Sequence, residues 1–200
     1  EMNKVITISR EYGAGGHTIG KQVAQELGIG LYDRDIVRET VQASGYDTET
    51  VQQEEGEVSK TSAFLKSILS NSAYYPNTQD AIHDVQQAVI LRYAQQGPCV
   101  ILGRCADEIL RTSGIPCLNV FIHASEIHRA ERMRKETGIT DTTELQRLIV
   151  RKDHLRRNYY NHYTGKQWGD SHNYHLTLDS GVLGDELCVQ MIVAAARSMP

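Results

Sequence analysis

A short apolar run, a glycine-rich stretch and a helical pattern follow one another near the start of this chain, and this order constrains the fold most. Residues 5–8 (VITI) are branched and wholly apolar, which is typical of a strand buried on both faces. The stretch SREYGAGGHTIGKQ (9–22) comes next, and Ile19, Val23 and Leu27 then recur at helical spacing. A buried strand, a tight loop and a helix in this order predict one unit of a parallel α/β sheet.

The rest of the chain repeats this alternation of apolar runs and helical patterns. Further strands are predicted at 31–32, 99–102, 117–122 and 174–178. Helical spacing is found at residues 36–44, 64–72, 82–93, 106–110, 125–135, 141–159 and 187–196. We therefore expect a parallel sheet with helices on both faces and a ligand beyond the carboxyl ends of the strands. The residues that follow the strands matter most under this prediction: 9–18, 32–35, 103–107 and 123–125.

Length and composition favour one globular domain, residues 1–200, with a small molecule as its partner. The formal net charge of -4, with no long basic run, argues against binding to a nucleic acid polymer. The four cysteines form no CxxC pair, which favours reduced thiols over disulfides or a metal site. No segment approaches the ~20 apolar residues of a membrane span, and no signal peptide is recognisable, so a cytoplasmic location without membrane partners is expected.

Two helical patterns follow each other without a strand between them, at 64–72 and 82–93. They predict a helical insertion of about residues 45–97 that lies over the sheet. Both patterns are amphipathic and could pair across a two-fold axis in a homodimer. A second region, about residues 129–170, is basic and largely helical.

The glycine stretch has the residues of a phosphate-binding loop. Glycines between a strand and a helix let backbone amides turn inward, while the helix aims its positive end at an anion. Such loops also need a lysine for the phosphates and a hydroxyl for magnesium. If the loop is read as GxxxxGK over 15–21, Gln22 stands where the hydroxyl belongs. Lys21 is carried away from the anion by a rise of about 1.5 Å per residue, so we interpret it as an exposed helix lysine.

A second alignment of the loop resembles nucleoside monophosphate kinases, whose loop reads GxxGxGKGT. Gly13, Gly15 and Thr18 match this pattern, whereas Gly16 stands at the lysine and His17 at the glycine after it. Thr18 is then the candidate hydroxyl for Mg²⁺. The predicted ATP phosphate-binding residues are Gly13, Ala14, Gly15, Gly16, His17 and Thr18.

Several interpretations of the missing lysine remain open. Arg10, at the strand end, could bend over the loop and supply a guanidinium in place of the ammonium. His17 could contribute as a donor or, when protonated, as a charge. Otherwise the loop binds phosphate without efficient catalysis, or it is only a tight structural turn.

The resemblance extends over nearly the whole chain. The segments that carry it are VITISREYGAGG, IGKQVAQELG, LYDRDIV, VILGRCADEIL, CLNVFIHASEIHRAERM, RKDHLRRNYYNHYTGKQWGD and NYHLTLDSGVLG. In this order they resemble the cytidylate kinase-like family, relatives of bacterial CMP kinases. The resemblance implies a P-loop NTPase-like α/β fold, ATP and Mg²⁺ as cofactors, and a small acceptor such as CMP or dCMP.

Two residues at strand ends are expected to bind the acceptor. In CMP kinases a GRD motif holds the acceptor phosphate, and this chain has Gly103 and Arg104 there, with Cys105 in place of the aspartate. A guanidinium matches phosphate oxygens well, although Arg104 could instead form a surface salt bridge. Asp33 corresponds to an aspartate near the acceptor site. It could hold hydrated magnesium or a sugar hydroxyl, or it could cap the following helix.

The resemblance implies that about residues 129–170 form a lid, and this region carries a cluster of cations. Arg151 lies on the face of the helix opposite its apolar stripe, and Arg156 and Arg157 extend the charged segment. Phosphoryl transfer needs positive charge around the moving group, so these three arginines and Arg10 are the predicted catalytic residues. A solvated helix face is the alternative. One arginine among Arg129, Arg132 and Arg134 is also expected to contact the donor nucleotide, but the sequence does not say which. The aromatic residues at 159–168 could stack a base, although packing is favoured.

These features lead to one main hypothesis and two alternatives. The main hypothesis is an ATP-dependent phosphotransferase similar to cytidylate kinases. The first alternative is a nucleotide-binding or anion-binding regulator that has lost turnover along with the loop lysine. The second is a kinase for a small molecule that is not a nucleotide.

Overall fold

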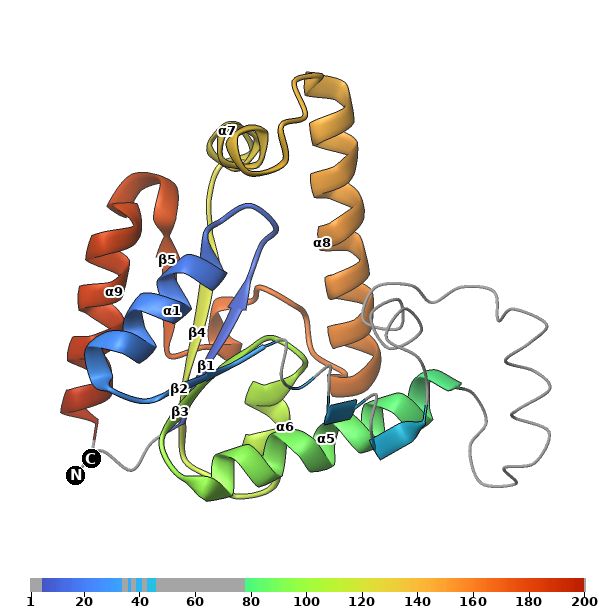
Figure 1. Cartoon of the computed structure of the whole chain (residues 1–200), viewed down its shortest axis with the longest axis vertical. Coiled ribbons are helices and arrows are strands. Elements are labelled where there is room, and N and C mark those ends of the chain that lie inside the picture. Colours follow the sequence, from blue (N-terminus) through green and yellow to red (C-terminus); the bar gives the residue numbers. More distant parts are fainter. Residues whose placement is uncertain (1–4, 34–35, 37–38, 41–42, 46–77, 200) are drawn as a thin grey trace.

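A computed structural model describes residues 5–33, 36, 39–40, 43–45 and 78–199 of the chain. Within them, five parallel strands form one sheet in the order β2-β3-β1-β4-β5 (Figure 1). The strands are β1 (Val5–Arg10), β2 (Gly30–Tyr32), β3 (Cys99–Leu102), β4 (Cys117–His123) and β5 (Leu176–Asp179). The alternation of apolar runs and helical patterns therefore predicted the sheet correctly.

Helices cover both faces of the sheet. They are α1 (Gly16–Leu27), α5 (Thr78–Gln96), α6 (Ala106–Thr112), α7 (Glu126–Thr137), α8 (Thr142–Thr164) and α9 (Ser180–Ser198), with a 3-10 turn at Ser171–Asn173. On one face, strand residues such as Ile6 and Ile8 pack against α1 and α9. On the other face, Val5 and Ile101 share a core with α5, α6 and the end of α8. The expected layers are confirmed.

The strand β1 passes from the core to the loop at its carboxyl end. Because side chains alternate along a strand, Arg10 follows Ile6 and Ile8 and faces the same side as α1. Beyond this edge of the sheet, α7 and the first half of α8 pack together around Met133 and Ile149 (Figure 1). The carboxyl edge is thus enclosed by α1 and the α7–α8 pair, which lies within the predicted lid region.

Several element boundaries follow from local signals. Gly28 ends α1 in the left-handed conformation, as glycine at a helix end commonly does. Asp141 caps α8, its side chain accepting from the Glu144 amide at 2.7 Å. The last helix was predicted to begin at 187, but α9 begins at Ser180 and passes through a non-helical Gly184. The helical spacing did not predict the first turns of α9, because the kink at Gly184 interrupts the regular spacing of the buried residues.

The predicted insertion lies mostly outside the described residues, and so does the helix predicted at 64–72. The helix predicted at 82–93 forms part of α5. Its residues Ile82, Val89 and Tyr93 are buried within the protomer. Val89 and Tyr93 belong to the protomer's own core, and the pairing of the two predicted helices across a two-fold axis remains a prediction. Among the described residues, no helix combines the length and apolarity needed to cross a membrane.

Candidate functional site

The loop between β1 and α1 presents backbone amides that the protein itself does not use. Gly13 and Gly15 adopt left-handed conformations, with φ of 80° and 83°, and α1 begins without a side-chain cap. Within the described chain, no group accepts a hydrogen bond from the amides of Gly15, Gly16, His17 or Thr18. Free amides at a helix start favour an anion, because the helix dipole adds to their partial charge.

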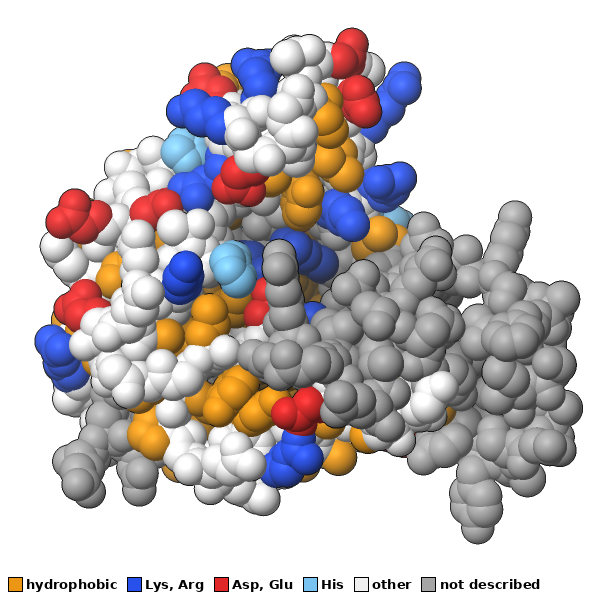
Figure 2. Space-filling view, in the orientation of Figure 1, with side chains coloured by type: hydrophobic (Ala, Val, Ile, Leu, Met, Phe, Trp, Pro, Cys, Tyr) orange, Lys and Arg blue, Asp and Glu red, His pale blue; other side chains and the backbone are white. Residues whose placement is uncertain are grey.

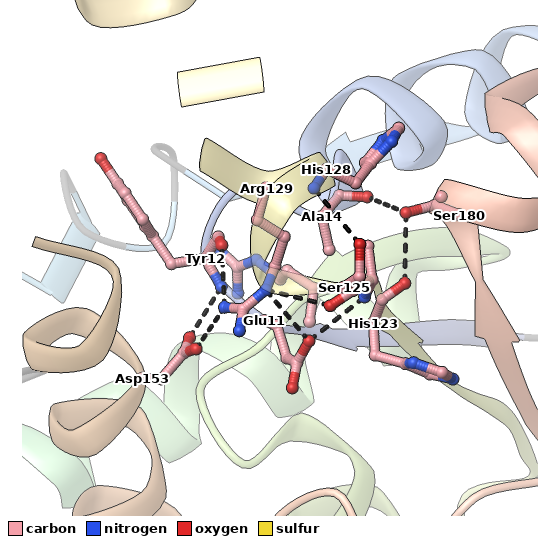
Figure 3. Close-up of polar contacts among 12 residues, drawn as sticks. Glu11, Tyr12, Ala14, His123, Ser125, His128, Arg129, Asp153 and Ser180 are labelled. Carbon is pink, nitrogen blue, oxygen red and sulfur yellow. Dashed lines mark hydrogen bonds and ion pairs between the residues drawn. The ribbon is translucent and has the colours of Figure 1, made fainter. Parts of the chain in front are cut away.

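The loop is held in place by three surrounding helices (Figure 3). The Tyr12 amide donates to Asp153 Oδ1 of α8 at 2.7 Å, and the Tyr12 carbonyl accepts from Arg129 Nη1 of α7 at 3.2 Å. Arg129 and Asp153 are themselves paired at 2.5 Å. The Ala14 carbonyl accepts from Ser180 Oγ of α9 at 2.6 Å. These bonds fix the path of the loop before any ligand binds.

The arginines of α7 have separate tasks. Arg129 is buried, and its Nε donates to the Ala124 carbonyl at 3.1 Å and lies 3.4 Å from Glu11 Oε2, so it holds the loop. Arg132 pairs with Asp185 of α9 at 2.5 Å. Its guanidinium lies directly against Gly15, where a Cβ atom would be 2.6 Å from Cζ. Arg134 is exposed. Of the trio, Arg132 is the one placed over the loop.

Arg10 extends from the end of β1 along the loop. Its side chain lies between Gly16 and Gly103, and its carbonyl accepts from Arg156 Nη1 at 3.0 Å. Burial lowers the pKa of Arg10, and the negative charge of Asp33 opposes this change. In the part of the chain that the structure describes, no carboxylate forms an ion pair with the Arg10 guanidinium.

Arg104 follows β3 in an unusual backbone segment. Gly103, Arg104 and Cys105 have φ of 67°, 61° and 57°, all left-handed. Such conformations are uncommon for residues other than glycine and cluster at functional sites. The Arg104 side chain is largely buried, with Nη2 3.5 Å from Asp33 Oδ1 and Nη1 3.4 Å from Gln86 Oε1. Burial lowers the pKa of Arg104 to about 10.

Arg10, Arg104 and Arg156 line one pocket with a volume of about 100 Å³. Since a water needs about 10–15 Å³, this pocket has room for a group such as a phosphate. Burial, followed by the positive charge of Arg10, lowers the pKa of Arg156 to about 9. Figure 2 shows basic side chains in the hollow between α1 and the α7–α8 end of the molecule. The remaining lining residues are Ser9, Leu102, Gly103, Cys105, Tyr159, Tyr160 and Trp168.

Asp33 provides negative charge to this cluster. It interacts electrostatically with Arg10, Arg104 and Arg156, and its Oδ2 lies 3.3 Å from His17 Nδ1. Burial alone would raise the pKa of Asp33, but Arg10 and Arg104 outweigh burial and hold the pKa below its usual value. The structure therefore places Asp33 beside Arg104. The magnesium, sugar-hydroxyl and helix-capping roles remain predictions.

The structure separates the predicted lid arginines. Arg156 lies in the pocket, whereas Arg157 is exposed and lies 5.7 Å from the Trp168 ring centre. Arg151 is exposed on another side of α8, about 140° around the helix from Arg156 at 3.6 residues per turn. It is not brought to the pocket. The aromatic residues Tyr159, Tyr160 and Trp168 are buried in the core and also line the pocket, so stacking on a base remains a prediction.

Residues 17, 18 and 21 all lie on the exposed part of α1. His17 and Thr18 are in its first turn, beside the free amides, so the Thr18 hydroxyl is placed to contact a ligand of the loop. Lys21 is one turn farther along the helix, as expected for a lysine that does not reach the phosphates.

Asp153 and Ser180 are site residues that sequence reasoning missed. For Asp153 a signal existed, since it falls four residues after Ile149 and eight after Leu145, on the apolar stripe of α8. A carboxylate on a buried stripe needs a cation or hydrogen-bond donors close by. Ser180 gave no local signal, because its partner, the Ala14 carbonyl, is 166 positions away.

Comparison with known proteins gives both a family and a fold. The model of the cytidylate kinase-like family matches residues 5–182. An uncharacterized protein from Eubacterium ventriosum ATCC 27560 superposes with a TM-score of 0.72 at 24% identity, covering 98% of this chain and 99% of that chain. The shikimate kinase of Bacteroides thetaiotaomicron gives 0.53 at 13% identity, covering 97% and 98%.

A gluconokinase from Sinorhizobium meliloti 1021 also gives a TM-score of 0.53, at 17% identity, covering 98% of this chain and 93% of that chain. At these identities the likenesses show the fold. No curated protein sequence matches the chain.

Proposed function

Because this chain belongs to the cytidylate kinase-like family, we propose that it transfers the terminal phosphoryl group of ATP to a small anionic acceptor. One observation carries the proposal. Arg10, Arg104 and Arg156 come from β1, the β3–α6 turn and α8 and meet in one pocket beside a loop with free amides. Three partly buried cations with few carboxylates near them favour an anionic ligand.

Each part of the site has a task under this proposal. Within the predicted loop 13–18, the free amides of Gly15, Gly16, His17 and Thr18 hold the phosphates of ATP, and the Thr18 hydroxyl holds Mg²⁺. When bound, ATP and Mg²⁺ supply the phosphoryl group and a divalent charge. Arg10 and Arg156 stabilise charge at the transferred group, with Arg151 and Arg157 as the further lid arginines named from the sequence. Catalysis of this kind depends on positioning and charge rather than on a covalent intermediate.

The acceptor is proposed to bind through Arg104, with Asp33 beside it. A phosphate fits the forked guanidinium, which favours CMP or dCMP and other nucleoside monophosphates. The likeness of the fold to shikimate kinase and gluconokinase supports a second candidate, a kinase for a small molecule that is not a nucleotide.

We propose that the protein acts in the cytoplasm on a small molecule, without a nucleic acid polymer or a membrane as partner.

ATP consumption separates these candidates. The wild-type protein is assayed with Mg²⁺ and ATP against CMP, dCMP, the other nucleoside monophosphates, shikimate and gluconate. We expect turnover with one class of acceptor and a loss of about 100-fold in kcat/KM for Arg104→Ala, the loss expected for one charged hydrogen-bond donor. Lys21→Ala, on exposed α1, is the matched control and should retain wild-type rates.

Three outcomes decide the proposal. Turnover with a nucleoside monophosphate supports the cytidylate kinase-like activity, and turnover with shikimate or gluconate supports the second candidate. Tight ATP binding without transfer to any of these acceptors would favour the non-catalytic regulator.

A further inference from the structure

We propose that Arg10 takes the place of the lysine that the loop lacks, and that Gly16 and Gly103 are glycines because the Arg10 side chain runs between them. The assignment of a ligand rests on the proposed function. The steric part rests on the protein alone. The two parts are therefore tested separately.

Gly16 is the first indication. It lies at the start of α1 in a helical backbone that accepts any residue, unlike Gly13 and Gly15, whose left-handed φ calls for glycine. A Cβ atom at position 16 would lie 2.6 Å from Cγ and 2.7 Å from Cβ of Arg10. Non-bonded carbons prefer about 3.5–4.0 Å. The Arg10 Cγ cannot move without a change of χ1, and its Cβ cannot move without a shift of the backbone. The backbone leaves position 16 open to a side chain, but Arg10 fills the space.

Gly103 is the second indication, at the other end of the same side chain. A Cβ atom there would overlap Nη1 of Arg10. The Gly103 amide also donates to the Ile8 carbonyl at 3.0 Å, which fixes this turn against β1. Gly16 thus makes room for the stem of Arg10, and Gly103 makes room for its guanidinium.

The direction of the charge is the third indication. Arg10 faces the side of α1, and its charge interacts with Arg104 and Asp33 in the pocket that Arg10 and Arg104 line. Its guanidinium forms no ion pair with the carboxylates that the structure describes. Its donors therefore remain available to an anion. The stem of Arg10 passes the loop at Gly16 and its guanidinium ends at Gly103, so the positive charge comes from β1 rather than from α1.

A consequence is that Arg10 and a lysine at position 16 exclude each other. Any side chain at 16 needs the space of the Arg10 Cβ and Cγ atoms, and only removal of the whole Arg10 side chain, as in Arg10→Gly, frees that space. The arginine and the glycine should therefore behave as one unit. Replacing Arg10 and Gly16 together is expected to restore the anion binding that either replacement alone weakens.

The steric part is tested by thermal unfolding without ligand. Gly16→Ala should lower Tm by roughly 5 °C in the wild-type background and by much less in the Arg10→Gly background, where both contacting atoms of residue 10 are absent. Gly20→Ala is the matched control on the same helix. A Cβ atom there meets Leu102 instead of Arg10, so its effect should be equal in both backgrounds. Equal effects of Gly16→Ala in both backgrounds would overturn the steric part.

The charge part is tested by calorimetric binding of inorganic triphosphate and of ATP with Mg²⁺. Arg10→Ala should weaken binding about 10- to 100-fold, as expected for a charged hydrogen-bond donor, and Lys21→Ala should not change it. Gly16→Lys alone should also weaken binding, whereas Arg10→Gly with Gly16→Lys should recover at least about tenfold over Arg10→Gly. Wild-type affinity of Arg10→Ala, or no recovery in the double variant, would overturn this part.

The two proposals can fail separately. If the wild type turns over ATP but Arg10→Ala binds and reacts normally, the role of Arg10 is wrong and the proposed function stands. If the wild type binds neither ATP nor triphosphate, the proposed function and the charge part fail together. The unfolding comparison still decides whether Arg10 and Gly16 share one space.

Discussion

Asp33 is the residue on which the charge balance of the pocket depends. It interacts with Arg10, Arg104 and Arg156, three guanidinium groups whose pKa values burial has lowered. Without a ligand, this carboxylate offsets part of their mutual repulsion. An anion bound in the pocket would also offset the repulsion among the arginines. The negative charges of Asp33 and of the anion would repel each other, so each should weaken the stabilisation that the other gives.

We expect Asp33→Asn to lower the free energy of unfolding by about 1–2 kcal/mol, because the arginines lose a charged partner. Pyrophosphate should then raise the Tm of Asp33→Asn more than that of the wild type, since the anion meets less repulsion and replaces the missing charge. Thermal unfolding with and without pyrophosphate measures both effects. Glu126→Gln, an exposed change on α7, is the control. An equal or smaller Tm rise in Asp33→Asn would contradict this account.

At the scale of elements, α8 connects the loop with the pocket. Asp153 fixes the Tyr12 amide, and Arg156, one turn farther along, reaches both the pocket and the Arg10 carbonyl. The sequence predicted this helix and its cap, because apolar spacing and a capping aspartate are local signals. It did not predict that the charged segment contains a buried ion pair, since the partner, Arg129, is on α7.

Asp153→Ala should lower the free energy of unfolding by about 3 kcal/mol, because Arg129 is left buried without its partner. Urea unfolding measures this loss. The exposed side of the loop should also become less ordered, so affinity for pyrophosphate should fall as well. Glu144→Gln, an exposed change in the first turn of the same helix, should leave both quantities unchanged. Wild-type stability of Asp153→Ala would show that the pair does not hold the loop.

At the scale of the whole molecule, α5 and α8 are joined on the far side of the pocket. His83 Nδ1 lies 2.6 Å from the Tyr159 hydroxyl, and the His83 ring stacks on Tyr163 at 3.7 Å between centres. Burial lowers the pKa of His83 from its usual 6.5 to about 4. The imidazole is therefore neutral at pH 7, and protonation disturbs the contact between the two helices.

The protein should lose stability as the pH falls from about 6.5 to about 4. In this range the unfolded chain binds a proton at His83 that the folded chain does not, so unfolding is favoured by acid. Since one pKa unit corresponds to about 1.4 kcal/mol, the loss from this group is about 3 kcal/mol at pH 4. Urea unfolding of the wild type and of His83→Gln across this range measures it. The difference between the two should shrink on acidification, and a constant difference would contradict the assignment.

The sequence by itself determined the layers of this protein, the loop and the strand ends at which the site lies. Hydrophobic periodicity, left-handed glycines and helix caps depend on neighbours a few positions apart, so they can be read directly from the residues. It also suggested Arg10 and His17 as sources of the missing charge and Lys21 as an exposed helix lysine, and these roles remain predictions.

Only the tertiary structure decided which arginines share the pocket and which hold the loop. The sequence alone does not distinguish Arg151 from Arg156, because both lie in the same charged helix. Arg156 lies on the side of α8 that contacts β1, whereas Arg151 is exposed. Asp153 and Tyr12 are 141 positions apart, and nothing local at either one specifies the other. The space over Gly16 is likewise defined by a side chain that reaches it from another element. Such contacts join residues far apart in the sequence, and they form only when the helices and strands that carry them pack together in the folded chain.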